Sequence, residues 1–275
     1  MKGAQVVVGA RGSVLSVAQT ESVISALRMR HPGYSFRLET ITTLGDRVKQ
    51  WRRSDTGIFV KEIEEALLKR KIDIAVHSVK DLPSRMHRGL VLAAVTRRED
   101  PRDVLISNVK CGLFDLPHGC RIGTSSLRRM AQILHVRPDV RVVELRGNLD
   151  TRIRKLREGN YDAIIVAAAG LRRLGIRGLC ARPVPETLML PAAGQGALAI
   201  EIRKGDSVMR RLVKPLDDCD SHACVESERS FLSQSRAGCR MPVAAFASIR
   251  GPRMALEGMI ISLDGKKMIR LSSCS

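Results

Sequence analysis

The feature that most constrains the fold is a short apolar stretch that runs straight into a group of titratable side chains. Residues 72–76 contain a single polar residue, Asp73, and helical sequence flanks them. Such a run is typical of a buried strand in the parallel sheet of an α/β protein. The polar group that follows, before Pro83, is His77, Ser78, Lys80 and Asp81. Because ligands of open α/β sheets bind at the carboxyl ends of strands, this group is a candidate site. The alternative is a polar loop that caps the strand.

The charge of the chain indicates an anionic ligand. Lys and Arg number 47 against 28 Asp and Glu, a formal net charge of +19. Such an excess attracts polyanions: nucleic acid, anionic lipid, or a small molecule with many carboxylates or phosphates. Aromatic residues make up only 3% of the chain, which disfavours a base-stacking surface for single-stranded nucleic acid. The arginines are spread through sequence that reads as folded, so we expect a polyanion held in a cleft and no nucleic-acid partner.

The cysteine pattern points to a reducing compartment and to one reactive thiol. The seven cysteines are odd in number and form no CxxC pair, which argues against a zinc or other metal site and against a disulfide framework. Cys239 lies between Gly238 and Arg240, and nearby cations favour the thiolate, so it is the most nucleophilic candidate. No apolar stretch approaches the length of a membrane span, and Arg11 interrupts the N-terminal apolar run. We therefore expect a cytoplasmic protein without a membrane partner.

The beginning of the chain reads as a strand, a loop and a helix. Residues 5–8 predict a strand, residues 9–12 a glycine-containing loop, and Ser13 a helix N-cap. This arrangement presents backbone N–H groups and Arg11 to an anion, although the motif alone is weak. Further along are predicted strands at 36–43 and 90–95, a polar loop at 45–56 that is either mobile or a solvated linker, and an amphipathic helix through Phe59, Ile63 and Leu67.

The middle of the chain places arginines after each of three predicted strands. These strands lie near Arg121 and at 140–145 and 162–166, and Ser126 is a predicted cap of the helix that begins at Leu127. The arginines that follow the strands are Arg128, Arg129, Arg146, Arg152, Arg172 and Arg173. Guanidinium groups pair carboxylate and phosphate oxygens in bidentate fashion, so the set predicts an anion-binding cleft. The alternative for the first pair is two surface arginines.

The predicted order of elements gives two α/β lobes and a third, smaller α/β domain. The charged stretch 97–103 reads as a boundary, and an apolar strand at 197–202 returns the chain to the first lobe. Two lobes joined by two crossovers are similar to the periplasmic-binding architecture, with a ligand between the lobes. We expect domain 1 at 1–98 with 197–215, domain 2 at 99–196, and domain 3 at 216–275.

Ten stretches in this order resemble the porphobilinogen deaminase (hydroxymethylbilane synthase) family. They are GARGSVLSVAQ, TTLGDR, GIFVKEIEEALL, DIAVHSVKDLP, REDPRDVLIS, IGTSSLRRMAQ, LRGNLDTRIRKL, YDAIIVAAAGLRRLG, LPAAGQGALAIE and AGCRMPVAAFA. The resemblance covers nearly the whole chain, and HSVKDLP and GTSSLRR are its most specific parts. It implies three α/β domains with the active site between the first two. It also implies a monomer that adds four porphobilinogen units to a dipyrromethane cofactor bound through Cys239, losing ammonia at each step and releasing a linear tetrapyrrole.

The resemblance also implies roles for individual residues. Asp81 would be the catalytic carboxylate, assisting proton transfer as ammonia departs and stabilising positive charge on a pyrrole nitrogen. Besides Cys239 and Asp81, the residues implied to hold the cofactor are Lys80, Ser126, Arg128, Arg129, Arg146 and Gly147. Those implied to bind substrate are Arg11, Ser13, Gln19, Arg152, Arg172, Arg173 and Gln195.

The sequence departs from the family pattern at two points, and two other functions are alternatives to the one that the resemblance implies. Thr56 stands where family members often have a lysine, and the third domain is shortened at its C-terminus, with no helix expected after Ile269. A non-catalytic two-lobed polyanion-binding protein would explain the arginines but leave Asp81 and Cys239 without a role. A nucleic-acid binder would show salt-sensitive binding and no covalent adduct.

Overall fold

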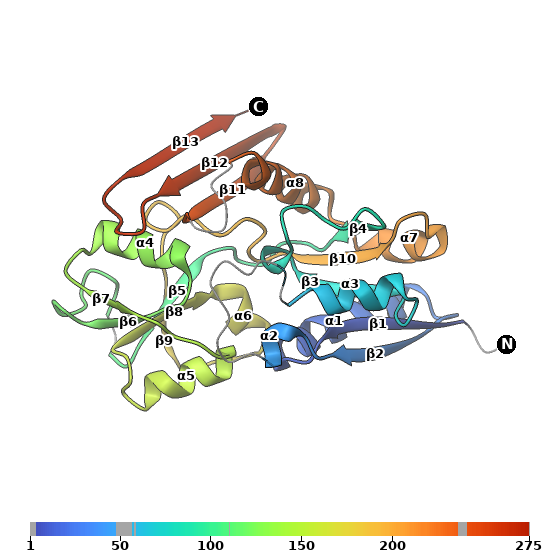
Figure 1. Ribbon diagram of the computed structural model, residues 1–275, viewed down its shortest axis with the longest axis horizontal. Coiled ribbons are helices and arrows are strands. Elements are labelled where there is room, and N and C mark those ends of the chain that lie inside the picture. Colours follow the sequence, from blue (N-terminus) through green and yellow to red (C-terminus); the bar gives the residue numbers. More distant parts are fainter. Residues whose placement is uncertain (1–3, 48–56, 58, 110, 236–240, 275) are drawn as a thin grey trace. The chain divides into compact units, whose positions relative to one another are not determined.

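The chain folds into two compact units, each of which contains two separate stretches of sequence (Figure 1). The computed structural model describes residues 4–47, 57, 59–109, 111–235 and 241–274. The first unit comprises Met1–Arg98 with Ala197–Glu226, and the second comprises Glu99–Gly196 with Ser227–Ser275. The division into three domains remains a prediction.

The first unit is built on a five-stranded sheet of order β2-β1-β3-β10-β4. Its strands are β1 (Gln5–Arg11), β2 (Ser35–Ile41), β3 (Ile74–Ser78), β4 (Leu90–Val95) and β10 (Leu198–Arg203). Its helices are α1 (Val14–Arg30), α2 (Leu44–Arg47), α3 (Lys61–Leu68), the 3-10 helices η1 (Val79–Asp81) and η2 (Lys214–Leu216), and α7 (Ser207–Val213). The helix α8 (Cys219–Gln234) begins in this unit.

The sequence predicted β3 as a strand of a parallel sheet, and the sheet that contains it is mixed. β1 pairs in parallel with β2 and β3, whereas β10 pairs antiparallel with both β3 and β4. The returning strand therefore lies in the interior of the first sheet, beside the strand that leads to Asp81. β3 also begins two residues later than expected and includes His77 and Ser78, because the pairing with β10 extends through Ser78.

The two faces of this sheet are covered by different helices. Because strand side chains alternate between faces, Ile74 and Val76 lie on the side of α1 and α7, where they join Ile24 and Leu212 in one apolar cluster. The other face carries Ala75, which packs with residues of α3 in a second cluster. The predicted polar loop at 45–56 begins inside α2, and residues 48–56 lie outside the described part of the chain.

The second unit contains a five-stranded sheet of order β7-β6-β8-β5-β9. Its elements are β5 (Asp103–Ser107), β6 (Arg121–Gly123), α4 (Leu127–Val136), β7 (Arg141–Val143), α5 (Leu149–Arg157), β8 (Ala163–Ala167), α6 (Ala168–Arg173) and β9 (Cys180–Pro183). The sheet begins with β5, earlier than the strand near Arg121 with which we expected it to begin. β6, β7 and β8 are parallel neighbours, while β5 pairs antiparallel with β8 and β9.

The end of the chain forms a separate antiparallel sheet of order β11-β12-β13. Its strands are β11 (Val243–Arg250), β12 (Arg253–Ile261) and β13 (Met268–Cys274), so the residues around and after Ile269 form a strand. Met259 and Ile261 of β12 pack with Ala131 of α4, which joins this sheet to the rest of the second unit. A Cβ on Gly258 would lie 2.4 Å from the Phe231 ring, so glycine there lets α8 approach the sheet closely.

The cysteines and the helices add two simple observations. Six of the seven cysteines lie in the described residues, and all six are free thiols. Across the described parts of the chain, every helix is too short or too polar to cross a membrane.

Candidate active site

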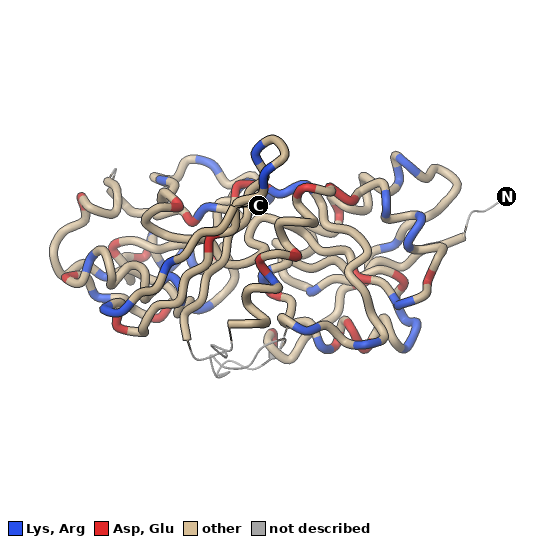
Figure 2. The backbone as a smooth tube through the Cα atoms, turned by 90° about the horizontal axis from the view of Figure 1, so that it is seen from above, with Lys and Arg blue, Asp and Glu red and all other residues tan. Residues whose placement is uncertain are grey.

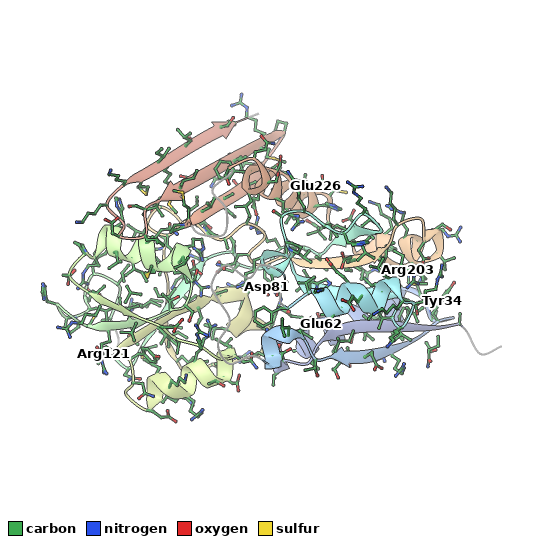
Figure 3. The ribbon with its side chains drawn as sticks, in the orientation of Figure 1. Tyr34, Glu62, Asp81, Arg121, Arg203 and Glu226 are labelled. Atoms are coloured by element: carbon green, nitrogen blue, oxygen red, sulfur yellow. The ribbon has the colours of Figure 1, made fainter. Side chains whose placement is uncertain are left out.

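The turn that follows β3 exposes Lys80 and Asp81 between two buried anchors. Val79 and Leu82 are buried and pack in one apolar cluster with Ala197. The backbone N–H of Val79 donates to the carbonyl of Ala197, and that of Leu82 donates to the carbonyl of Val79. Both charged residues are exposed at the carboxyl end of a buried strand. Figure 3 labels Asp81 in this turn. The fold therefore fixes the backbone of this turn and leaves the Asp81 carboxylate open to a ligand.

Arg11 lies at the end of β1 and is held by an acidic partner that we did not anticipate. Its Nη2 is 2.6 Å from Asp46 Oδ1, and its guanidinium carbon lies 4.0 Å from the centroid of the Phe59 ring. Burial opposes ionisation of Asp46, but hydrogen bonds from Arg11 and Thr43 outweigh it and lower the pKa of that carboxyl. The guanidinium is thus oriented by an ion pair and a cation–π contact before any ligand binds.

Two further predicted residues of the first unit have structural contacts. Ser13 is the N-cap of α1, as predicted, and its hydroxyl accepts a hydrogen bond from the Ser16 N–H. Gln19 is buried, and its amide oxygen accepts from the hydroxyl of Ser78 at 3.2 Å. Gln19 therefore ties α1 to the end of β3, next to the turn that carries Asp81.

In the second unit, three parallel strands bring arginines to one edge of the sheet. β6, β7 and β8 are neighbours, so their carboxyl ends meet at the same edge, as the sequence predicted. Ser126 caps α4 there, and its hydroxyl accepts from the Arg129 N–H at 3.4 Å. Lys and Arg are otherwise scattered along the backbone of both units (Figure 2).

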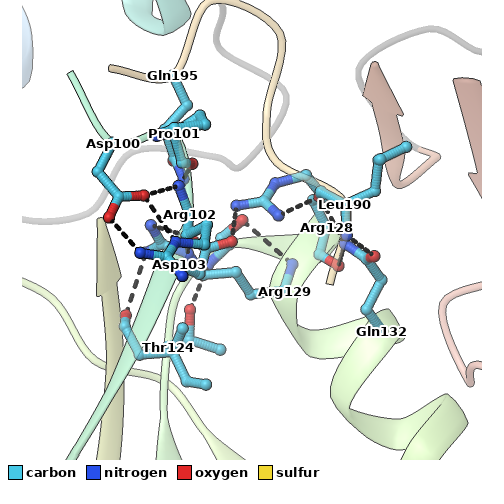
Figure 4. A network of polar contacts seen from close by, with 12 residues as sticks. Asp100, Pro101, Arg102, Asp103, Thr124, Arg128, Arg129, Gln132, Leu190 and Gln195 are labelled. Carbon is cyan, nitrogen blue, oxygen red and sulfur yellow. Dashed lines mark hydrogen bonds and ion pairs between the residues drawn. The ribbon is translucent and has the colours of Figure 1, made fainter. Parts of the chain in front are cut away.

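Arg128 and Arg129 are buried and converge on one buried carboxylate, Asp103 (Figure 4). Arg128 Nη2 lies 2.7 Å from Asp103 Oδ2, and Arg129 Nη2 lies 2.8 Å from Oδ1. The Gln195 amide also donates to Asp103 Oδ1, at 2.9 Å. The guanidinium groups further donate to the carbonyls of Leu190 and Ile165. The reading of this pair as surface arginines is thus wrong.

Charge balance in this network leaves one positive charge inside the second unit. Burial raises the pKa of Asp103, but the two guanidinium groups outweigh it and lower the pKa from 3.8 to about 2. Burial also lowers the pKa of Arg128, an effect that Asp103 opposes. A single carboxylate faces two guanidinium groups, and the positive end of the α4 dipole adds to the excess. Such a cluster favours a further anion.

Arg146, Gly147 and Arg152 form a local group after β7. Arg146 Nη2 lies 2.9 Å from Glu144 Oε1, and Arg152 Nε donates to the Gly147 carbonyl at 2.8 Å. Gly147 has φ of 114°, and a Cβ there would lie 2.8 Å from Thr151 Cγ2. Only glycine fits this turn without strain, and the turn directs its carbonyl to Arg152.

Arg172 and Arg173 end α6 and have different surroundings. Arg172 is exposed and contacts Glu99 at 3.4 Å and Asp100 at 3.2 Å. Arg173 is half-buried and donates to the Gly196 carbonyl at 2.6 Å. Burial lowers the pKa of the Arg173 guanidinium, partly offset by Glu99.

Two of the acids that hold these arginines, Asp103 and Asp46, were not predicted as site residues. Asp103 was assigned to a charged domain boundary, yet it is the first residue of β5 and fully buried. The available signal was an acidic residue directly before the four-residue run VLIS. Asp46 was assigned to a polar loop. Cys239, the predicted point of cofactor attachment, lies outside the described residues.

The comparisons with known proteins agree on one family. A family model described as porphobilinogen deaminase, dipyromethane cofactor binding domain, matches residues 6–211, and its C-terminal domain matches residues 222–274. The porphobilinogen deaminase of Roseiflexus castenholzii is 47% identical over 96% of this chain and 88% of its own length. That of Syntrophobacter fumaroxidans is 44% identical over 96% of this chain and 87% of its own.

A solved structure with low sequence identity is also similar to the chain. It is a probable amino-acid ABC transporter extracellular-binding protein from Bacillus subtilis, with a TM-score of 0.46 and 14% identity. The match covers 84% of this chain and 97% of that one.

Proposed function

Because the chain belongs to the porphobilinogen deaminase family, we propose that Asp81 is the carboxylate that serves its reaction. Enzymes of this family are transferases that condense porphobilinogen units on a covalently bound dipyrromethane cofactor and release hydroxymethylbilane. Each condensation expels ammonia and passes through positive charge on a pyrrole ring. A carboxylate close to that ring stabilises the charge and accepts or returns a proton.

The observation that carries this proposal is the turn between Val79 and Leu82. Both anchors are buried, while Asp81 between them is exposed at the carboxyl end of β3. Among the described residues no hydrogen bond or ion pair engages the Asp81 carboxylate. A carboxylate held by a rigid turn and without a competing partner is ready to face a cationic reaction centre.

The residues of the second unit fit a cofactor that carries several carboxylates. The buried pair Arg128 and Arg129 has one carboxylate, Asp103, for two positive charges, so the cluster has an excess cation to offer. When bound, the dipyrromethane supplies the pyrrole carbon to which porphobilinogen is joined. We propose that these arginines hold its acidic side chains, together with Lys80, Ser126, Arg146 and Gly147. The thiol of Cys239 is the proposed attachment point.

The remaining predicted residues are proposed to hold the substrate's own carboxylates. Arg11, Arg152, Arg172 and Arg173 supply guanidinium groups, and Ser13, Gln19 and Gln195 fix the local backbone or side chains around them. The contacts that support this are the ion pair of Arg11 with Asp46 and the position of Arg172 beside Asp100. Each condensation adds two carboxylates, which is why several cationic positions are needed.

Replacement of Asp81 by asparagine tests the proposed function. Within the described part of the chain the exposed Asp81 side chain makes no hydrogen bond or ion pair, so Asp81→Asn is expected to fold and to carry the cofactor by intact mass. Its kcat is expected to fall at least about a hundredfold. Asp220→Asn, which removes an exposed carboxylate on α8, is the matched control and should keep the wild-type rate. A wild-type kcat in the Asp81 variant would remove this residue from its role.

We also propose that the enzyme works as a monomer in the cytoplasm. The predicted free thiols support a reducing compartment, and the six described cysteines are free. Sedimentation velocity over a range of concentrations tests the oligomeric state, and a concentration-dependent dimer would contradict it.

A further inference from the structure

The hairpin of β12 and β13 makes contacts to which the proposed function assigns no role. Arg270 of β13 lies opposite Met259 in the register of the two strands, so both side chains lie on the same face of this sheet. On that face Met259 packs with Ala131 of α4 and with Leu190, and all three are fully buried. Arg270 therefore projects from the face that packs against the helix carrying Arg128.

The Arg270 guanidinium donates to two consecutive backbone carbonyls. Its Nη1 donates to the Thr187 carbonyl at 2.6 Å, and its Nη2 donates to the Glu186 carbonyl at 3.0 Å. Its Nε forms an ion pair with Glu257 of β12, which orients the guanidinium. Two acceptors in fixed positions suit the planar, forked guanidinium, whereas a lysine ammonium is a single charge on a flexible stem. Arg270 thus fixes the backbone at Glu186 and Thr187 relative to the C-terminal sheet.

The two carbonyls belong to a short segment, residues 185–190, that is held from both sides. The segment makes one helical turn, in which the Met189 N–H donates to the Pro185 carbonyl at 3.0 Å. Leu190 ends it. The Leu190 N–H donates to the Gln132 amide oxygen at 2.7 Å, and the Leu190 carbonyl accepts from Gln132 Nε2 at 3.1 Å. The segment is therefore fixed by β13 at its middle and by α4 at its end.

The Leu190 carbonyl also helps to set the direction of the Arg128 guanidinium (Figure 4). Arg128 Nη1 donates to this carbonyl at 2.7 Å, while its Nη2 pairs with Asp103 Oδ2 at 2.7 Å. Arg128 is buried, so a guanidinium N–H whose acceptor moves away becomes a costly unsatisfied donor unless the side chain follows it. A displacement of Leu190 therefore displaces Arg128.

We propose that Arg270 is a positioning residue for the anion-binding arginines of the second unit. It holds residues 185–190, and the last carbonyl of that segment sets the direction of Arg128. Arg270 itself touches neither cofactor nor substrate and acts through two backbone contacts. The functional part of this proposal rests on the proposed role of Arg128 in holding an acidic side chain of the cofactor, whereas the effect of Arg270 on the geometry of Arg128 does not.

Nitrogen-15 NMR of the guanidinium groups of the whole enzyme tests this geometry without any turnover. Wild type is expected to show slowly exchanging Arg128 signals, because this side chain is buried and hydrogen-bonded, and Arg128→Met identifies them by their loss. Arg270→Met should shift or broaden these signals and leave those of Arg137, the C-cap of α4, unchanged. Arg253→Met is the matched control, since Arg253 is an exposed arginine of the same sheet, and it should leave both sets unchanged.

Three results of this experiment overturn the proposal. The first is an unchanged set of Arg128 signals in Arg270→Met. The second is an equal change in the Arg137 signals, because a general loss of structure would give it. The third is the lack of slowly exchanging Arg128 signals in wild type, which contradicts the hydrogen bond to Leu190 on which the reasoning depends.

Steady-state kinetics test the functional part. A displaced Arg128 misplaces the cofactor that it holds, so Arg270→Met should lower kcat roughly ten- to a hundredfold. KM for porphobilinogen should not change, because the residues proposed to bind substrate keep their contacts. Arg270→Lys can donate to only one of the two carbonyls at a time and should recover part of the rate, whereas Arg253→Met should match wild type. A wild-type kcat in Arg270→Met, or a rise in KM in place of the fall in kcat, refutes the positioning role.

Arg128→Met separates a failure of this proposal from a failure of the proposed function. Asp103 keeps Arg129 as a partner in this variant, at 2.8 Å, so we expect it to fold. A wild-type kcat in Arg128→Met shows that Arg128 does not hold the cofactor, which refutes the proposed function of this residue. The NMR comparison of Arg270→Met with wild type is independent of that result, because it measures only whether Arg270 sets the geometry of Arg128.

Discussion

The buried ion-pair network of the second unit makes a strong prediction about Asp103. Asp103→Asn preserves the shape of the side chain but removes the one carboxylate that, within the described part of the chain, pairs with Arg128 and Arg129. The pKa of Asp103 falls from 3.8 to about 2 in the folded protein. At about 1.4 kcal/mol per pKa unit, ionisation of this carboxyl alone stabilises the fold by roughly 2–3 kcal/mol. Removal of one partner from a buried ion pair costs about 3–5 kcal/mol in general, so we expect a loss of about 3 kcal/mol or more.

The pH dependence of this loss gives an independent check of its cause. Because the folded-state pKa lies below the unfolded value, the stabilisation is complete above about pH 4 and is lost as the pH falls towards about 2. Urea unfolding followed by circular dichroism, repeated at several pH values, measures the difference between wild type and Asp103→Asn. That difference should be constant near neutral pH and should shrink in acid.

A second aspartate provides the control for this experiment. Asp139 forms a similar ion pair with Arg137 at 2.6 Å, and its pKa is also lowered to about 2, chiefly by its hydrogen bond with Arg137. Its side chain is 21% exposed, whereas that of Asp103 is 0% exposed. Asp139→Asn should therefore destabilise the protein much less. If Asp103→Asn proves as stable as wild type within about 0.5 kcal/mol, the network does not carry the energy assigned to it.

Two smaller perturbations test how the fold presents its arginines. Ser126→Ala removes the N-cap of α4 and should lower the free energy of unfolding by about 1 kcal/mol, measured by urea titration. An unchanged free energy of unfolding would show that the 3.4 Å contact between the Ser126 hydroxyl and the Arg129 N–H contributes nothing. Gly147→Ala combines a left-handed φ of 114° with a 2.8 Å approach to Thr151 and should cost about 1–3 kcal/mol. Gly119→Ala, with φ of 72° and nothing within 4 Å, should cost less in the same titration, so equal losses would contradict the steric part of the reasoning.

Features that depend on local chemistry were predictable from the sequence. Ser13 and Ser126 were expected to be N-caps because each precedes an apolar helical pattern, and both hydroxyls accept the capping hydrogen bond. The edge lined by arginines followed from three strand-like runs, each with arginines after it, and β6, β7 and β8 are indeed parallel neighbours.

Features that depend on distant parts of the chain were not predictable. Asp103 reads as one charge among several in a linker until Arg128, 25 residues later, is placed against it. The first sheet was expected to be parallel, and it is mixed because β10 enters beside β3 from a distant part of the sequence. The contact of His77 with Glu201 spans 124 residues. The position of Asp103 directly before the run VLIS is a local signal of burial, but it does not show which side chains lie against this carboxylate.

The net charge of +19 does not measure how strongly the arginines bind a ligand, because several of them pair with acids of this chain. Arg11, Arg146 and Arg172 each contact a carboxylate of this chain, as the buried pair in the second unit does. A ligand carboxylate that binds such a guanidinium must share it with the resident acid, so each contact contributes less than one with an unpaired cation would. A chain that gains carboxylates at every condensation would otherwise bind more tightly as it grew. We propose that arginines already paired in this way orient the growing chain and still allow the completed product to leave.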